Sequence, residues 1–91
     1  MSDIHHEIVH FTGRVQGVGF RFQALQVARE FEVAGYVQNL PDGRVRLEVE
    51  GARPEIEDYL TALVERMESH IRSSERVAGR RAPRFSGFEI R

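Results

Sequence analysis

The stretch Gly13–Arg21, which reads GRVQGVGFR, decides the fold because an alternating segment ends at its start and a helical pattern begins at its end. Three glycines within seven residues let the backbone turn tightly and expose its N–H groups. A helix that begins after this loop adds unpaired N–H donors and a partial positive charge. Arg21 places a full positive charge in the first helical turn. The stretch therefore suits a small, multiply charged oxyanion, and a phosphate fits it best.

A second interpretation of the same glycines is that they form only a tight connection between a strand and a helix. Loop composition alone favours this second interpretation. The loop lacks the Gly-Lys-Ser/Thr ending of the Walker motif, and it lacks Gly-x-Gly-x-x-Gly with an acidic residue about 20 positions later. Neither nucleotide-binding motif therefore applies.

The segments on either side of the loop predict a strand and a helix. Residues 7–13 alternate, with Val9 and Phe11 on one face, which predicts a strand. From Phe20 onward, apolar residues recur at helical spacing, which predicts a helix over residues 21–32 that ends before Gly35.

The middle of the chain predicts two strands, over residues 34–40 and 44–50. The turn sequence PDG at residues 41–43 joins them. The second strand alternates, so we expect its three apolar residues to point inward and its charged residues to point toward solvent. The inward set is Val45, Leu47 and Val49, and the outward set is Arg46, Glu48 and Glu50.

The last third of the chain predicts a second helix and two strands. Pro54 fits the first turn of a helix that ends near Ser69. Its expected buried stripe is Ile56, Tyr59, Leu60, Leu63, Val64 and Met67. Residues 70–81 are mostly polar and predict an edge strand. Residues 85–90 predict a final short strand, with Phe88 and Ile90 facing inward.

This order of elements predicts an α+β domain with the ferredoxin-like βαββαβ arrangement. We expect an antiparallel sheet of four to five strands with both helices on one face. The 91 residues contain no linker, repeat or low-complexity segment, so we expect a single domain over residues 1–91.

Composition excludes several classes of function. The formal net charge of −1 argues against a strongly basic nucleic-acid binder, and no apolar run is long enough to span a membrane. The first residues do not resemble a secretory signal, so we expect a cytoplasmic protein. There is no cysteine, and all 13 basic residues are arginine. Thiol and lysine chemistry are therefore absent, and any anion must be held by guanidinium groups or backbone amides.

The loop string, together with NLPDG at residues 39–43, resembles the acylphosphatase family. The resemblance runs from about residue 9 to residue 51 and returns over residues 85–91. It implies a ferredoxin-like fold and hydrolysis of the carboxyl–phosphate anhydride bond of a small acyl phosphate. It also implies that no cofactor or metal is needed. We expect a monomer with no nucleic-acid or membrane partner.

The resemblance also assigns roles to individual residues. It makes Arg21 the phosphate-binding arginine and Asn39 the residue that orients the attacking water. An amide is not a useful base, but its carbonyl oxygen can aim a water molecule while a phosphate oxygen of the substrate takes the proton. The phosphoryl group is expected to lie against the backbone amides of Gln16, Gly17, Val18, Gly19 and Phe20. Arg14, in the same string, is interpreted as structural or as a contributor to the local field.

Other groups of reactive residues give weaker evidence for a functional site. His6 and His10 share a strand face but lie about 13 Å apart, at roughly 3.3 Å per residue, which is too far for one metal ion. We expect the histidines to lie at the surface. Glu48 and Glu50 could form an acid–base pair, but their alternation with arginines favours a solvated, charged face.

A binding module on the same fold is the alternative function. Binding of RNA on the sheet requires aromatic residues on the central strands, and residues 44–50 contain none. The acylphosphatase-like domain of larger carbamoyl-transferring maturation proteins is a second version, which the absence of a partner domain in this chain disfavours. A non-catalytic sensor of phosphate or acyl phosphate remains open.

Overall fold

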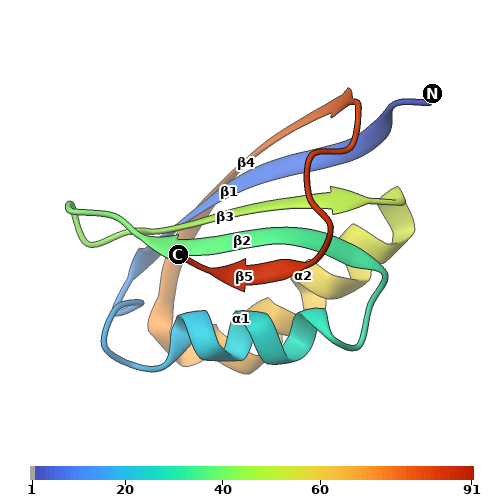
Figure 1. Cartoon of the computed structure of the whole chain (residues 1–91). Coiled ribbons are helices and arrows are strands. Elements are labelled where there is room, and N and C mark those ends of the chain that lie inside the picture. The colour runs from blue at the N-terminus through green and yellow to red at the C-terminus, as the bar shows by residue number, and fades with distance from the viewer. Residues whose placement is uncertain (1) are drawn as a thin grey trace.

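The computed structural model describes residues 2–91 and contains five strands and two helices in this part of the chain. The strands lie in the order β4-β1-β3-β2-β5, and Figure 1 shows both helices on one face of the sheet. The ferredoxin-like arrangement predicted from the sequence is confirmed. The elements are β1 (Ile4–Gly13), α1 (Phe20–Ala28), β2 (Val33–Asn39), β3 (Val45–Gly51), α2 (Arg53–Met67), a 3₁₀ turn (Glu68–His70), β4 (Ile71–Arg81) and β5 (Phe88–Ile90).

The sheet is mixed, because β5 pairs with β2 in parallel, whereas all other pairs are antiparallel. The expectation of a purely antiparallel sheet is therefore wrong at this edge. Arg81, Gly51 and Val33 lie at the same end of the sheet, as the register of β1, β3 and β2 shows. Only residues 82–87 connect β4 to β5. The short connection forces β5 to begin at that end and to run alongside β2.

The core lies between the sheet and the two helices. Val9, Phe11 and Leu47 from the sheet meet the apolar faces of both helices, and all are buried. The Tyr59 hydroxyl donates a hydrogen bond of 2.9 Å to the carbonyl oxygen of Ala24, which ties α2 to α1. Val64 departs from the predicted stripe, because it lies at the margin of α2 and is 38% exposed. No helix within residues 2–91 is long and apolar enough to cross a bilayer.

The opposite face of the sheet corrects the expectation that Glu48 and Glu50 are solvated. Both are buried, because residues 81–85 pass over them. The guanidinium of Arg81 donates to Glu48 at 2.6 Å. The backbone amides of Arg84 and Phe85 donate to the Glu50 carboxylate at 2.9 and 3.1 Å. These carboxylates hold the segment between β4 and β5 in place rather than forming an acid–base pair.

The outer strand β4 is the polar edge strand predicted for residues 70–81, and it pairs with β1. A partly buried ion pair joins the two strands, with Arg76 Nε donating to the buried Glu7 Oε1 at 2.6 Å. His5 contacts the second carboxylate oxygen of Glu7 at 3.0 Å. The histidines are half-buried rather than fully at the surface. Burial and the neighbouring Arg81 lower the pKa of His6.

Candidate catalytic pocket

The loop between β1 and α1 forms the floor of a pocket with a volume of about 210 Å³. Gly17 and Gly19 have φ angles of 76° and 79°, which only glycine adopts readily. Gly19 is also the N-cap of α1, and no side chain caps the helix there. Because the first helical N–H groups have no partner within a helix, this end of α1 keeps donors available for an anion.

Arg21 and Asn39 both line this pocket, although they lie 18 positions apart in the chain. Arg21 stands in the first turn of α1, and Asn39 is the last residue of β2. The Arg21 guanidinium donates from Nη1 to the carbonyl oxygen of Arg91 at 3.2 Å, so the segment after β5 contacts it. The topology therefore brings the two residues singled out from the sequence to one hollow.

The side-chain oxygen of Asn39 is buried and accepts no hydrogen bond from any group in residues 2–91. Buried polar atoms in folded proteins almost always have a partner, so an unpaired acceptor calls for a functional explanation. Asn39 pairs with Val45 across the β2–β3 ladder, which fixes its backbone. Asn39 lines the pocket, so its unpaired acceptor is buried beside this hollow at a position that the strand ladder fixes.

Three of the five residues predicted to hold the phosphate through their amides line the pocket: Gly17, Gly19 and Phe20. Gln16 and Val18 do not. The Gln16 side chain is directed away, toward the β2–β3 turn, and donates to the carbonyl oxygens of Leu40 and Arg44 at 2.7 and 2.9 Å. Gln16 therefore fastens the loop to the turn that follows Asn39.

Sequence reasoning missed the apolar part of the lining, which consists of Val15, Phe22 and Ile90. Phe22 is 53% exposed and Ile90 is 41% exposed, so the expectation that Ile90 faces inward is wrong. Phe22 falls outside the buried stripe of α1, and an exposed phenylalanine beside a glycine-rich loop was the available signal. For Ile90 there was no signal, because its place depends on the parallel pairing of β5 with β2.

Known proteins resemble this chain in both sequence and structure. An acylphosphatase from Trichormus variabilis is 52% identical over 52 residues, which cover 57% of this chain and 52% of that protein. An acylphosphatase from Chloroflexus aurantiacus is 42% identical over 76 residues, which cover 75% of this chain and 83% of that protein. The alignment thus spans about half of the first relative and most of the second.

Solved structures agree with this similarity. The crystal structure of acylphosphatase from Bacillus subtilis superposes with a TM-score of 0.84 at 26% identity, and the match covers 94% of this chain and 97% of that one. A full-length HypF, in its phosphate- and nucleotide-bound form, matches with a TM-score of 0.78 at 25% identity, covering 99% of this chain but only 12% of HypF. The family model described as Acylphosphatase matches residues 7–90. The chain belongs to the acylphosphatase family.

Proposed function

We propose that this protein hydrolyses acyl phosphates to a carboxylate and orthophosphate without a metal ion. The main support for the proposal is that Arg21 and Asn39 line the same pocket, next to the uncapped start of α1. The family supports the reaction class. The finer roles of these residues rest on the contacts and charges described above.

In the proposed mechanism, the phosphoryl group lies against the loop amides and the Arg21 guanidinium. Both are hydrogen-bond donors, so they stabilise the charge on the phosphoryl oxygens as the transition state forms. Each charge-assisted hydrogen bond of this kind contributes roughly 1.5–3 kcal/mol. Catalysis then consists mainly of positioning and electrostatic stabilisation, as in other phosphoryl transfers.

Asn39 would orient the attacking water through its unpaired side-chain oxygen. The water oxygen bonds to phosphorus, the bond from phosphorus to the carboxylate oxygen breaks, and the proton of the water passes to a phosphate oxygen. A carboxylate is a good leaving group, so the reaction needs no strong protein base. Phe22 and Ile90 at the mouth offer apolar contact for the acyl group.

The direct test is hydrolysis of benzoyl phosphate by the purified protein with excess chelator. We expect hydrolysis at the same rate with and without chelator. Saturable binding of orthophosphate without hydrolysis, in the presence or absence of metal ions, would instead identify a non-catalytic binding module. A cytoplasmic location and a monomeric state remain predictions, to be checked by fractionation and by light scattering.

A further inference from the structure

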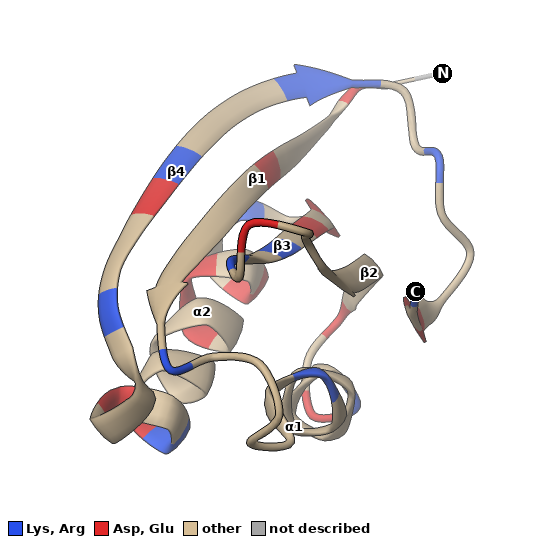
Figure 2. Ribbon diagram, turned by 90° about the vertical axis from the view of Figure 1, so that its left-hand side faces the viewer, with Lys and Arg blue, Asp and Glu red and all other residues tan. Residues whose placement is uncertain are grey.

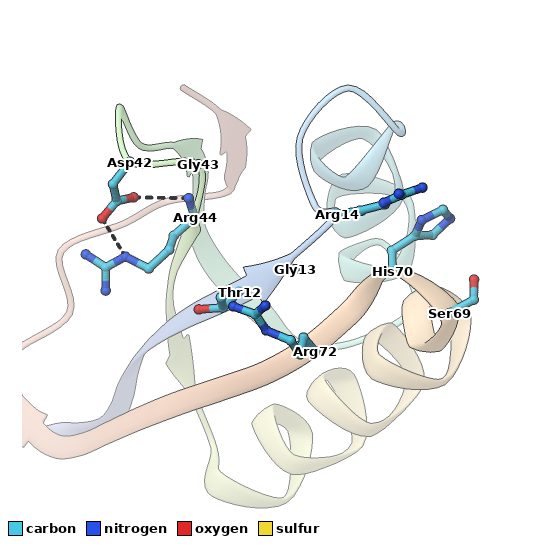
Figure 3. Close-up of a pocket in the computed structure, with 9 residues that line it drawn as sticks. All are labelled: Thr12, Gly13, Arg14, Asp42, Gly43, Arg44, Ser69, His70 and Arg72. Atoms are coloured by element: carbon cyan, nitrogen blue, oxygen red, sulfur yellow. Dashed lines mark hydrogen bonds and ion pairs between the residues drawn. The ribbon is translucent and has the colours of Figure 1, made fainter.

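A second hollow lies on the other side of the glycine-rich loop and has a larger volume, about 540 Å³. Its lining comes from residues 12–14 at the end of β1, residues 42–44 in the β2–β3 turn, and residues 69, 70 and 72 around the start of β4. We call this hollow the basic cleft. Figure 3 shows three arginines from these three separate segments around it.

The charge in the basic cleft is not balanced. Its only acidic lining residue, Asp42, is already paired with Arg44, through contacts to the Arg44 amide at 3.0 Å and to Nε at 2.8 Å. Arg14 and Arg72 form no ion pair and donate no side-chain hydrogen bond within the part of the chain that is described. Two guanidinium groups thus lie beside one hollow without an internal anion, in a protein whose formal net charge is −1.

The backbone brings these two arginines close together. Gly13 has a φ of 136°, and a Cβ at this position would lie 2.7 Å from the Arg72 amide nitrogen. The start of β4 therefore approaches the end of β1 as closely as a glycine allows. Figure 2 shows one basic position just after β1 and another near the start of β4. The fold itself places the backbones of the two arginines on neighbouring walls, while their side chains extend in different directions along the hollow (Figure 3).

Two further hydrogen-bond donors complete the lining. Figure 3 shows the Arg72 side chain reaching toward Thr12, and the His70 ring beside Arg14. A hydroxyl and an imidazole can each donate a hydrogen bond to an anion. Guanidinium groups match the geometry of phosphate oxygens with two parallel N–H bonds. The size of the hollow lies in the range of small-molecule sites, roughly 300–1,000 Å³.

We propose that the basic cleft is a second anion site, separate from the catalytic pocket, which binds a small phosphate compound carrying two or more negative charges. The two linings share no residue, and the hydrogen bonds of Gln16 to Leu40 and Arg44 fasten the loop next to the turn that lines the basic cleft. The site does not depend on the proposed hydrolysis. Arg14 and Arg72 hold the anion from two walls, while Arg44, already paired with Asp42, shapes the third.

The test is an NMR titration of ¹⁵N-labelled full-length protein with inorganic pyrophosphate at constant ionic strength. We expect saturable shifts of the amides of residues 12–14, 42–44 and 70–72 in the native protein and in Arg21→Gln. In Arg14→Gln/Arg72→Gln these shifts should need at least about tenfold more pyrophosphate, because each lost guanidinium removes a charge-assisted bond.

The matched control is Arg29→Gln/Arg53→Gln, which removes the same charge from two exposed arginines outside both pockets. If pyrophosphate binding weakens equally in this control, the shifts depend on the overall charge of the protein and not on a site in the cleft, and the proposal is overturned. Shifts confined to residues 15–21 would also overturn it, and so would loss of the cleft shifts in Arg21→Gln. Heteronuclear spectra of each variant show whether the fold is intact. These results are independent of whether benzoyl phosphate is hydrolysed.

Discussion

The two hollows beside the glycine-rich loop are proposed to hold an anion in two different ways. The catalytic pocket relies on backbone geometry, with left-handed glycines, an uncapped helix end and one guanidinium. The basic cleft is more than twice as large and relies on side-chain charge gathered from three segments. The donors of the catalytic pocket are proposed to hold a small group rigidly for the reaction. In the basic cleft, the charge comes from side chains, and the donors have no fixed arrangement. Together the two proposals assign catalysis to one side of the loop and binding to the other.

The largest effect is expected from replacing, one at a time, the two side chains that are proposed to act in catalysis. Arg21→Ala and Asn39→Ala should each lower the turnover of benzoyl phosphate by at least ~100-fold, because preorganised groups that act in the transition state are lost. Pyrophosphate binding in the basic cleft should persist in both variants. Arg29→Gln serves as the control for an exposed arginine. A variant with near-native turnover would remove that residue from the mechanism.

Replacement of Gln16 should have a smaller effect, which is expected on both turnover and stability. Gln16→Ala removes two hydrogen bonds that join the loop to the turn after Asn39. We expect turnover to fall about tenfold through misplacement of the loop, and the free energy of unfolding to fall by about 1 kcal/mol. Steady-state kinetics and urea unfolding measure the two losses. Native turnover combined with reduced stability would show that Gln16 has no positioning role.

The exposed apolar residues of the catalytic pocket, Phe22 and Ile90, should affect only which acyl phosphate is preferred. Phe22→Ala removes a half-exposed ring from the catalytic pocket, so the KM for benzoyl phosphate should rise about fivefold, which corresponds to about 1 kcal/mol of lost contact. The KM for acetyl phosphate should change little. Val77→Ala on β4 is the control, because Val77 is exposed but lines neither hollow. An equal rise for both substrates would contradict a role in acyl-group recognition.

The partly buried Glu7–Arg76 ion pair lines neither hollow and should affect stability alone. Burial would raise the pKa of Glu7, but hydrogen bonds from Arg76 and His5 outweigh it and hold the pKa below its ordinary value of 4.5. The ion pair therefore stabilises the fold above pH 4.5, and this stabilisation is lost as the pH falls through the lowered pKa. Glu7→Gln should be less stable than the native protein at pH 7, with a difference that shrinks below pH 4.5. Urea unfolding at several pH values measures this difference, and an unchanged difference at low pH would contradict the assignment. Turnover at pH 7 should not change.

Local patterns predicted most of the fold, whereas the resemblance to a known family predicted the proposed catalytic pair. The alternation around Val9 and Phe11, the helical spacing after Phe20 and the turn at residues 41–43 are local signals, and each gave the correct element, although α1 ends at Ala28 rather than at residue 32. Arg21 and Asn39 were found because a resemblance linked two separate motifs. That both line one hollow agrees with this expectation, while their catalytic roles stay predictions.

What the sequence did not predict depends on long-range placement. Glu48 and Glu50 alternate like solvated residues, and only the passage of residues 81–85 over the sheet buries them. The basic cleft likewise assembles residues from three segments, and although two of these overlap the motifs, neither motif indicated a second site. Ile90 reaches the catalytic pocket because β5 lies parallel to β2. Periodicity describes which face a residue takes, but not what later covers that face.

The most direct test of the central claim is hydrolysis of benzoyl phosphate in ¹⁸O-labelled water, followed by mass spectrometry of both products. If Asn39 aims water at a phosphorus atom held by Arg21 and the loop amides, each turnover places one ¹⁸O atom in orthophosphate and none in benzoate. Label in benzoate would show that water attacks the carbonyl carbon instead, and it would contradict the account.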